Sequence, residues 1–176
     1  MCEMTGMGGV GLQSIRTSAT LASMKNGSKI EALAEYPVVT VLPVQWGDQD
    51  AFGHVNNTVP IRWFESARIA YLRNTDLGMV ERGSLGPILA SVRCDYRQQV
   101  RYPDTVHIGA RVGRVGNTSI HIHHRAYSDS QQAVVVEGDT VLATFDYDSQ
   151  CTVRVPDNLR KQINALEGTD VAEIRD

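Results

Sequence analysis

Residues 46–57 read WGDQDAFGHVNN, and they join an apolar run, Val38 to Val44, to a helical pattern that begins near Pro60. The stretch gathers two carboxylates, a glycine, a histidine and two asparagines just before a helix start. Asparagine and aspartate are common in turns and helix caps. A helix start also offers unpaired backbone N–H groups that can bind an anion. The stretch is therefore either an elaborate turn or a site.

The pattern after this stretch predicts one long helix from about Thr58 to Asp76, stopped by Gly78. Asn57 or Thr58 is the expected N-cap, and Pro60 suits the first turn because its missing N–H costs nothing there. Its apolar residues form more than one stripe: Ile61, Trp63, Phe64, Ala67, Ala70, Tyr71 and Leu72. A helix that is apolar over so much of its circumference is expected to be covered on several sides.

Strands are expected on both sides of this helix. The first runs from Val38 to Trp46 and is interrupted by Pro43, which suits an edge or a bulge. After the helix the apolar period changes to two, which predicts a strand whose buried face holds Ile88, Ala90, Val92, Cys94 and Tyr96. Further strands follow turns at 102–104, 116–117 and 128–130, and the last, Gln131 to Tyr147, is expected to break near Gly138. Hairpin-linked strands are antiparallel. The fold class is therefore α+β, with an antiparallel sheet around a single helix.

Length and composition suit one folded domain. The 176 residues carry a net charge of −3 and no compensating basic stretch, which argues against nucleic-acid binding. The three cysteines show no metal-binding spacing, so a reducing compartment, the cytoplasm, is the default expectation. No apolar run reaches the roughly 20 residues of a membrane span.

The ends of the chain differ from its middle. Residues 1–36 are rich in Gly, Ser, Thr and Met and poor in acids before Lys29. They are read as a flexible extension, as an overcalled start with Met24 as the true one, or as a presequence that would send the protein to an organelle matrix. A short helix capped by Ser28 is expected within them. The folded domain is placed at 37–155. Residues 156–176 are assigned to a short helix opened by Pro156 and a tail that frays after Gly168.

The stretch from Gly47 to Asn57, followed by the run WFESAR at 63–68, resembles the hotdog-fold acyl-CoA thioesterases. Within them it is most similar to the 4-hydroxybenzoyl-CoA thioesterase type, in the branch with a GDxDxxGHVNN signature. The resemblance covers about residues 38–150. It implies a hotdog fold, an antiparallel sheet of about five strands wrapped around one long central helix. It also implies a homodimer or homotetramer that binds the acyl thioester between subunits, at the N-terminus of that helix.

The resemblance implies a role for each polar residue of the stretch. Asp50 matches the catalytic aspartate, which either attacks the thioester carbonyl or acts as a base on water. The backbone N–H near Asn57 would stabilise the oxyanion, and Gly53 would let the backbone turn towards the ligand. His54 is expected to position the loop or contact the ligand rather than transfer a proton. Asn56 is expected to hold the loop by hydrogen bonds.

Two other acids have structural alternatives. Asp48 is expected to hold the loop by hydrogen bonds. Another lineage of hotdog thioesterases uses a carboxylate from the central helix, so Glu65 is a candidate secondary acid. Its structural alternative is an ion pair with Arg62 or Arg68.

The strand histidines and arginines invite a metal or phosphate interpretation. His121 and His123 share a strand face while His124 points to the apolar side, and no carboxylate or cysteine completes a ligand set. No metal site is therefore expected. The arginines are expected to form a solvated face, with one or two meeting the phosphates of coenzyme A: Arg93, Arg97, Arg101, Arg111, Arg114 and Arg125.

The function that the resemblance implies is an acyl-CoA thioesterase of fatty acid metabolism, which releases a free acid and coenzyme A. No cofactor is expected, because coenzyme A is part of the substrate. The alternative is a non-catalytic acyl-CoA-binding hotdog module that serves as a sensor or scaffold. A hotdog dehydratase is a third alternative, but its histidine and helix acid are imitated only loosely by His54 and Glu65.

Overall fold

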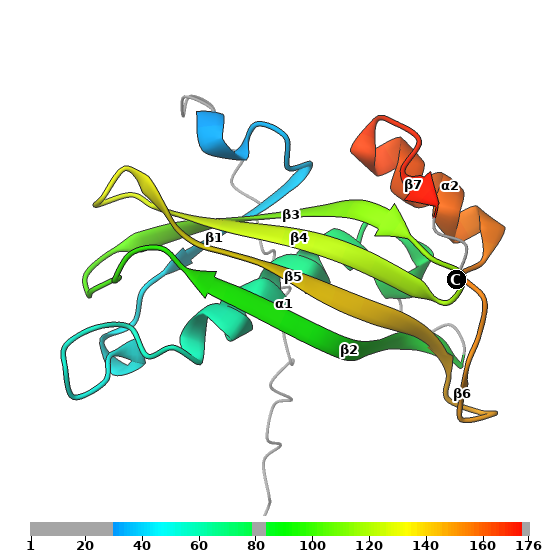
Figure 1. Ribbon diagram of the computed structural model, residues 1–176, viewed down its shortest axis with the longest axis horizontal. Coiled ribbons are helices and arrows are strands. Elements are labelled where there is room, and N and C mark those ends of the chain that lie inside the picture. Colours follow the sequence, from blue (N-terminus) through cyan, green and yellow to red (C-terminus); the bar gives the residue numbers. More distant parts are fainter. Residues whose placement is uncertain (1–29, 79–83, 174–176) are drawn as a thin grey trace, which may run out of the picture.

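The structure is a computed structural model that describes residues 30–78 and 84–173. Five long antiparallel strands form a curled sheet in the order β1-β3-β4-β5-β2. Their bounds are β1 Val38–Pro43, β2 Leu85–Tyr96, β3 Thr105–Val115, β4 Ser119–Ser128 and β5 Ala133–Asp146. The long helix α1, Val59–Leu72, crosses one face of the sheet, and α2, Asp157–Glu167, lies near one end of it (Figure 1). The strand order and the single long helix confirm the predicted α+β fold.

Short elements complete the chain. Three 3₁₀ helices are η1 Glu31–Leu33, η2 Trp46–Asp48 and η3 Asp76–Gly78, and two short strands are β6 Cys151–Thr152 and β7 Ala172–Glu173. The first strand stops at Pro43 rather than at the predicted Trp46, because the chain turns into η2 there. Among the described residues, no helix is long and apolar enough to cross a membrane.

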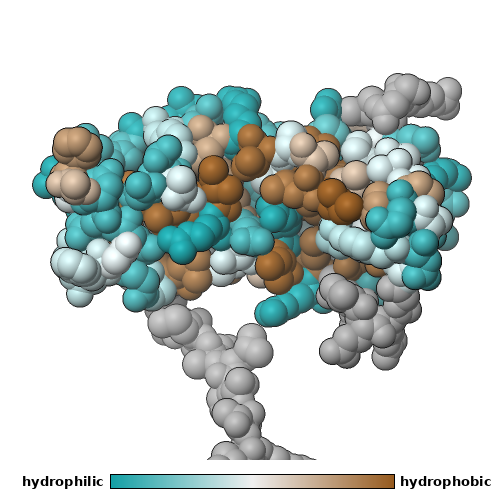
Figure 2. All heavy atoms as spheres, turned by 90° about the horizontal axis from the view of Figure 1, so that it is seen from below, coloured by the Kyte–Doolittle hydropathy of each residue, from teal (hydrophilic) through white to brown (hydrophobic). Residues whose placement is uncertain are grey.

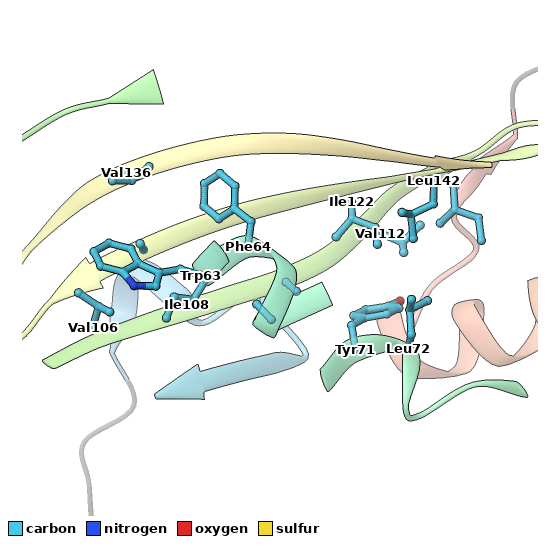
Figure 3. Close-up of a cluster of buried hydrophobic side chains, with 14 of the residues drawn as sticks. Trp63, Phe64, Tyr71, Leu72, Val106, Ile108, Val112, Ile122, Val136 and Leu142 are labelled. Atoms are coloured by element: carbon cyan, nitrogen blue, oxygen red, sulfur yellow. The ribbon is translucent and has the colours of Figure 1, made fainter. Parts of the chain in front are cut away.

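The core lies between α1 and the sheet. Trp63 and Phe64 point from the first half of α1 towards the strands, near Val106, Ile108 and Val136 (Figure 3). Tyr71 and Leu72 occupy the other end of the same core, beside Val112, Ile122 and Leu142 (Figure 3). The ring of Phe64 is fully buried and stacks on the imidazole of His124, with ring centroids 4.7 Å apart. The apolar pattern of α1 therefore faces the sheet, as expected for a covered helix.

The last long strand passes through Gly138 without a break, so the predicted interruption is wrong. A Cβ atom at Gly138 would lie 2.1 Å from the carbonyl oxygen of Arg93 and 2.6 Å from the ring of Phe64. The glycine is needed because α1 and β2 approach the backbone of β5 closely at this point.

The end of α1 was also predicted wrongly, since the helix stops at Leu72 rather than near Asp76 and Gly78. The hydroxyl of Thr75 donates a 2.8 Å hydrogen bond to the carbonyl of Leu72. The amide of Asn74 donates a 3.0 Å bond to the carbonyl of Ala70. In a longer helix these carbonyls would accept hydrogen bonds from backbone N–H groups of the next turn. Here the two side chains donate to them instead. At the other end Thr58, one of the two expected residues, is the N-cap.

The register of β2 differs from the predicted alternation. A bulge between Leu89 and Ser91 changes the phase, so Leu89 and Val92 lie opposite the buried residues Leu142 and Thr140 of β5. Ile88 and Ala90 therefore do not share a face with Val92, because a bulge inserts one residue into the strand. The inward side chains of β2 are also not buried, since Leu89, Val92 and Tyr96 are 42%, 37% and 50% exposed.

Residues 30–36 pack against the outer face of the sheet. Leu33 and Tyr36 are buried, and the ring of Tyr36 lies directly over Gly109, where a Cβ atom would be 2.5 Å from Cγ. The guanidinium groups of Arg111 and Arg125 lie over this ring at 5.8 and 5.4 Å from its centroid. The helix predicted here is only the three-residue η1, and Ser28, its expected cap, lies outside the described residues.

The C-terminal segment is anchored to the core. The carboxylate of Glu167, at the end of α2, accepts hydrogen bonds of 2.6 Å from the hydroxyl of Tyr71 and 2.7 Å from the backbone N–H of Val112. Gly168 ends α2 with a φ of 69°, and β7 then pairs in parallel with the end of β3. The prediction that the tail frays after Gly168 is therefore wrong as far as Glu173.

His124 gives the fold a dependence on pH. Burial lowers the pKa of His124 to about 3, and the charges of Arg68 and His123 add to this effect. The unfolded chain, with an ordinary histidine pKa of about 6.5, binds a proton below that pH which the folded chain does not bind. The stabilisation by neutral His124 is therefore complete above pH 6.5 and declines as the pH falls towards 3.

We expect His124→Gln to reduce the loss of stability on acidification. Between pH 7 and pH 5 the free energy of unfolding of the wild type should fall by about 2 kcal/mol more than that of the variant. Urea unfolding curves at several pH values measure this difference. Other titrating groups are common to both proteins, so parallel pH curves would contradict the role of His124.

Candidate active site

The stretch 46–57 folds into a tight turn between β1 and α1. The backbone N–H of Asp50 donates to the carbonyl of His54 at 2.8 Å, and that of Gly53 donates to the carbonyl of Asp50 at 3.0 Å. Gly53 has a φ of +73°, a conformation that other residues adopt only with strain. A Cβ atom there would meet nothing within 4 Å, so the turn needs glycine for its backbone conformation alone. Trp46 and Phe52 are exposed on the outside of the turn.

Among the described residues, one carboxylate oxygen of Asp50 accepts a hydrogen bond and the other has no partner. Its Oδ1 accepts a 2.8 Å hydrogen bond from the backbone N–H of Phe52, which fixes the side chain in an Asx turn. No residue in the described ranges donates to Oδ2. The side chain is therefore oriented by the turn while one oxygen stays available to a ligand.

Asn56 and Asn57 have different roles at the start of α1. The Oδ1 of Asn56 accepts hydrogen bonds from the backbone N–H and the hydroxyl of Thr58, at 2.9 and 2.8 Å. Asn56 thus satisfies an N–H group of the helix start. The carbonyl of Asn57 accepts a hydrogen bond from the hydroxyl of Tyr96, whereas its own N–H has no partner within residues 30–78 and 84–173. That N–H remains a free donor at the positive end of the helix dipole.

A pocket of about 340 Å³ brings these groups together. Its lining consists of Asp50, His54, Val55, Asn57, Pro60, Tyr96, Arg97, Gln98, Gln99, Val100 and Val136. Three of the predicted site residues, Asp50, His54 and Asn57, therefore share one cavity. Gly53 and Asn56 lie outside the lining, where they shape the turn and the helix start. Glu65 is exposed on α1 and does not line this pocket.

Tyr96 is a site residue that the sequence reasoning missed. It lies at the end of β2, far from Asn57 in the chain, and the pairing of β2 with β5 carries its hydroxyl to the start of α1. Burial raises the pKa of Tyr96 to about 12, and hydrogen bonding with Cys94 acts in the same direction. The phenol is therefore protonated at neutral pH and donates to the Asn57 carbonyl. The sequence offered one signal for this role, because the alternation of the strand placed the side chain of Tyr96 on its inward face.

The contact between His54 and Arg101 defines which ring nitrogen carries the proton. Nη2 of Arg101 lies 2.9 Å from Nε2 of His54. A guanidinium can only donate, so Nε2 must accept and the imidazole proton must be on Nδ1. His54 in this arrangement can offer a ligand an N–H donor from Nδ1, while Nε2 accepts from Arg101.

Asp48 connects the turn to α1. Its Oδ2 accepts a 2.8 Å hydrogen bond from the backbone N–H of Gln45, and its Oδ1 pairs with Nη2 of Arg62 at 3.0 Å. The side chain of Asp48 is 13% exposed, so most of it is covered by its neighbours. The suggested ion pair between Arg62 and Glu65 is wrong, because Arg62 forms its ion pair with Asp48.

The strand histidines lie as the alternation predicted. His124 is buried inside, and His123 on the opposite face contacts the carboxylate of Asp139. In the described part of the chain, no group of three or more His, Cys, Asp or Glu side chains is placed to hold a metal ion. The outer-face arginines pair with acids: Arg93 with Asp95 and Asp139, Arg97 with Glu137, Arg111 with Glu35, and Arg125 with Glu35 and Glu137.

Comparison with known proteins places this architecture in a family. A family model described as the thioesterase-like superfamily matches residues 44–163, which include the turn, α1 and all the long strands after it. The chain belongs to the thioesterase-like superfamily. A thioesterase of Thermus thermophilus, solved in complex with coenzyme A and Zn, is 29% identical. This comparison covers 77% of the present chain and 98% of that one, with a TM-score of 0.68.

Other proteins that this chain resembles differ in how much of it they match. The PA2801 protein of Pseudomonas aeruginosa is 30% identical over 73% of this chain and 98% of its own, with a TM-score of 0.65. The comparison with the thioesterase superfamily structure from Jannaschia sp. CCS1 covers 81% of this chain and 91% of that one, with a TM-score of 0.74. The sequences are 24% identical, so this likeness shows the fold alone. The uncharacterised protein YsmA of Bacillus subtilis (strain 168) is 33% identical over 81 residues, which are 46% of this chain and 54% of YsmA. The match thus spans about half the length of that relative.

Proposed function

We propose that this thioesterase-like protein is an acyl-CoA thioesterase of the 4-hydroxybenzoyl-CoA thioesterase type, which hydrolyses an acyl-CoA to a free acid and coenzyme A. The observation that carries the proposal is that the free Oδ2 of Asp50 and the unpaired N–H of Asn57 belong to one pocket. Thioester hydrolysis needs a nucleophile or base on one side of the carbonyl and a donor for its oxygen.

The residues divide the reaction between them. Asp50 attacks the thioester carbon, so that coenzyme A leaves as a thiolate and water then hydrolyses the mixed anhydride, or it takes a proton from a water that attacks directly. The N–H of Asn57 and the dipole of α1 stabilise the oxyanion in both routes. The Nδ1–H of His54, held by Arg101, adds a donor at the pocket wall. No cofactor is required, since coenzyme A is part of the substrate.

The coenzyme A moiety is supported by the complex of the Thermus thermophilus thioesterase. Two cations lie at the pocket of the present chain: Arg97 lines it, and Arg101 holds the pocket residue His54. Arginine binds phosphate oxygens with two parallel hydrogen bonds, so these two residues are the first candidates for phosphate contacts.

The pocket is proposed to lie between subunits of a homodimer, or of a homotetramer built from such dimers. The strand β2 is the last in the sheet order, and its inward apolar side chains are exposed. A band of apolar residues crosses the face of the molecule that Figure 2 shows. An open strand edge with exposed apolar groups is unfavourable in a monomer and suits pairing with another chain.

Thiol release from a panel of acyl-CoAs tests the proposed activity. The panel should include short, medium, long and aromatic acyl groups at saturating concentration. We expect catalytic release of coenzyme A from at least one class. A non-catalytic acyl-CoA-binding module would bind these compounds in calorimetry without releasing the thiol, and that outcome would overturn the proposed enzyme.

A further inference from the structure

Asn57 lies one residue before Thr58, the N-cap of α1, so its carbonyl is outside the hydrogen-bond ladder of the helix. The partner of this carbonyl comes from a distant strand, because the hydroxyl of Tyr96, the last residue of β2, donates to it. Asn57 and Tyr96 both line the candidate active-site pocket. The bond therefore connects the end of β2 to the residue whose N–H is the proposed oxyanion donor.

The two peptide groups on either side of Asn57 are held by different partners. In the group before it, the carbonyl of Asn56 accepts a 2.9 Å hydrogen bond from the backbone N–H of Val59. In the group after it, the N–H of Thr58 donates to Oδ1 of Asn56 at 2.9 Å, and the carbonyl accepts from Tyr96. Peptide groups are planar, so fixing the planes on both sides of Asn57 fixes both of its backbone dihedral angles. These three bonds therefore set the direction in which the N–H of Asn57 points.

Tyr96 supplies the one bond of the three that the segment 56–59 cannot make for itself. Without the phenol hydroxyl the carbonyl of Asn57 would bond to water, which follows the carbonyl as it rotates and so fixes nothing. Tyr96 is held on a paired strand, opposite Val136 of β5. Its phenol also remains a donor at neutral pH, since burial raises the pKa of Tyr96 to about 12. Donors that are oriented before the reaction stabilise developing charge without a cost of reorganisation.

We propose that Tyr96 is a positioning residue for thioester hydrolysis, whose hydroxyl holds the carbonyl of Asn57 and thereby directs the N–H of Asn57 at the oxyanion. This role rests on the proposed function and adds to the same site a residue from β2. Tyr96 acts through Asn57 and transfers no proton. Its effect belongs to the transition state, because the carbonyl oxygen of the substrate carries its full negative charge only there.

The variant Tyr96→Phe removes the hydroxyl and keeps the ring. With the best acyl-CoA of the panel, kcat should fall about 10- to 100-fold, less than the roughly 100- to 1,000-fold loss that follows outright removal of an oxyanion donor. The N–H of Asn57 is still present in this variant but is no longer held in one direction. KM should stay within about threefold of the wild-type value, because an interaction made in the transition state alone affects kcat rather than ground-state binding. Steady-state thiol release measures both constants.

Tyr147→Phe is the matched control. Tyr147 is 49% exposed, against 50% for Tyr96, and its hydroxyl also donates to a backbone carbonyl, that of Pro87 in the first part of β2. Tyr147 does not line the pocket, so this variant should keep the wild-type kcat. Titration calorimetry with coenzyme A counts the sites able to bind in each protein. A lower kcat at an unchanged number of sites is then not due to an unfolded fraction.

The outcomes separate this role from the activity itself. The role of Tyr96 would be overturned by a wild-type kcat in Tyr96→Phe, by an equal fall of kcat in Tyr147→Phe, or by a change confined to KM. A fall of kcat that only matches a loss of coenzyme A sites would overturn it as well. Each of these results leaves the thioesterase activity of the wild type standing. A wild type that releases no thiol from any acyl-CoA of the panel would instead overturn the proposed function, and this role with it.

Discussion

Replacing Asp50 with asparagine is expected to lower kcat for thioester hydrolysis by at least about 1,000-fold, with little change in KM. The amide keeps an oxygen that can accept the N–H of Phe52, so the Asx turn persists. It cannot act as a nucleophile or a base, and each of these roles contributes factors of about 100 to 10,000 or more. Steady-state thiol release from the best acyl-CoA of the panel measures the effect.

Asp48→Asn is the matched control for this substitution. Asp48 is an equally acidic residue of the same turn, but its oxygens are taken by Gln45 and Arg62. We expect its loss to reduce stability by about 1 kcal/mol or less and to leave kcat within about fivefold of the wild type. If the Asp50 variant kept full activity, or if the Asp48 variant were the inactive one, the assignment of Asp50 would be wrong.

Replacing Gly138 with alanine should give the largest loss of stability of any substitution by a single methyl group. The new Cβ atom would have to avoid the backbone carbonyl of Arg93 as well as the ring of Phe64. A ring can shift, but the carbonyl belongs to the neighbouring strand, so β2 must move away from β5. Overpacking typically costs about 1 to 3 kcal/mol, and a clash with backbone puts this substitution at the upper end, about 3 kcal/mol. The midpoint of thermal unfolding should therefore fall by roughly 6 to 12 °C.

Gly47→Ala provides the control, because a Cβ atom at Gly47 would meet nothing within 4 Å. Its unfolding midpoint should stay close to that of the wild type. Calorimetric or circular-dichroism melts compare the three proteins. Equal midpoints for the Gly138 variant and the wild type would show that β2 and α1 do not approach β5 as closely as described.

The architecture could be predicted because its signals are local. The period of apolar residues distinguishes the strands from α1, and the hairpin between β3 and β4 forms where Gly116 binds the carbonyl of Ser119. Asp50, His54 and Asn57 could be predicted to lie together for the same reason, since one turn holds all three. Their proposed roles came from the resemblance and remain to be measured.

The features that were missed depend on contacts between distant segments or on competition between side chains and backbone. In the sequence alone, Gly138 indicates a break in the strand. The structure shows instead that a side chain at this position would collide with Phe64 and with the carbonyl of Arg93. The bulge in β2 reverses the inward and outward faces without a change in the apolar pattern. The side chains of Asn74 and Thr75 end α1 by donating hydrogen bonds to carbonyls of its last turn. Helix propensity does not indicate such bonds.

The two tryptophans of the chain lie in opposite surroundings. Trp46 is 74% exposed on the turn that carries Asp50, whereas Trp63 is 4% exposed in the core beneath the sheet. Their fluorescence is thus separable by emission wavelength and by access to a dissolved quencher. Trp46 can report occupancy of the turn while Trp63 reports the integrity of the core, so the protein carries two intrinsic optical probes and needs no added dye.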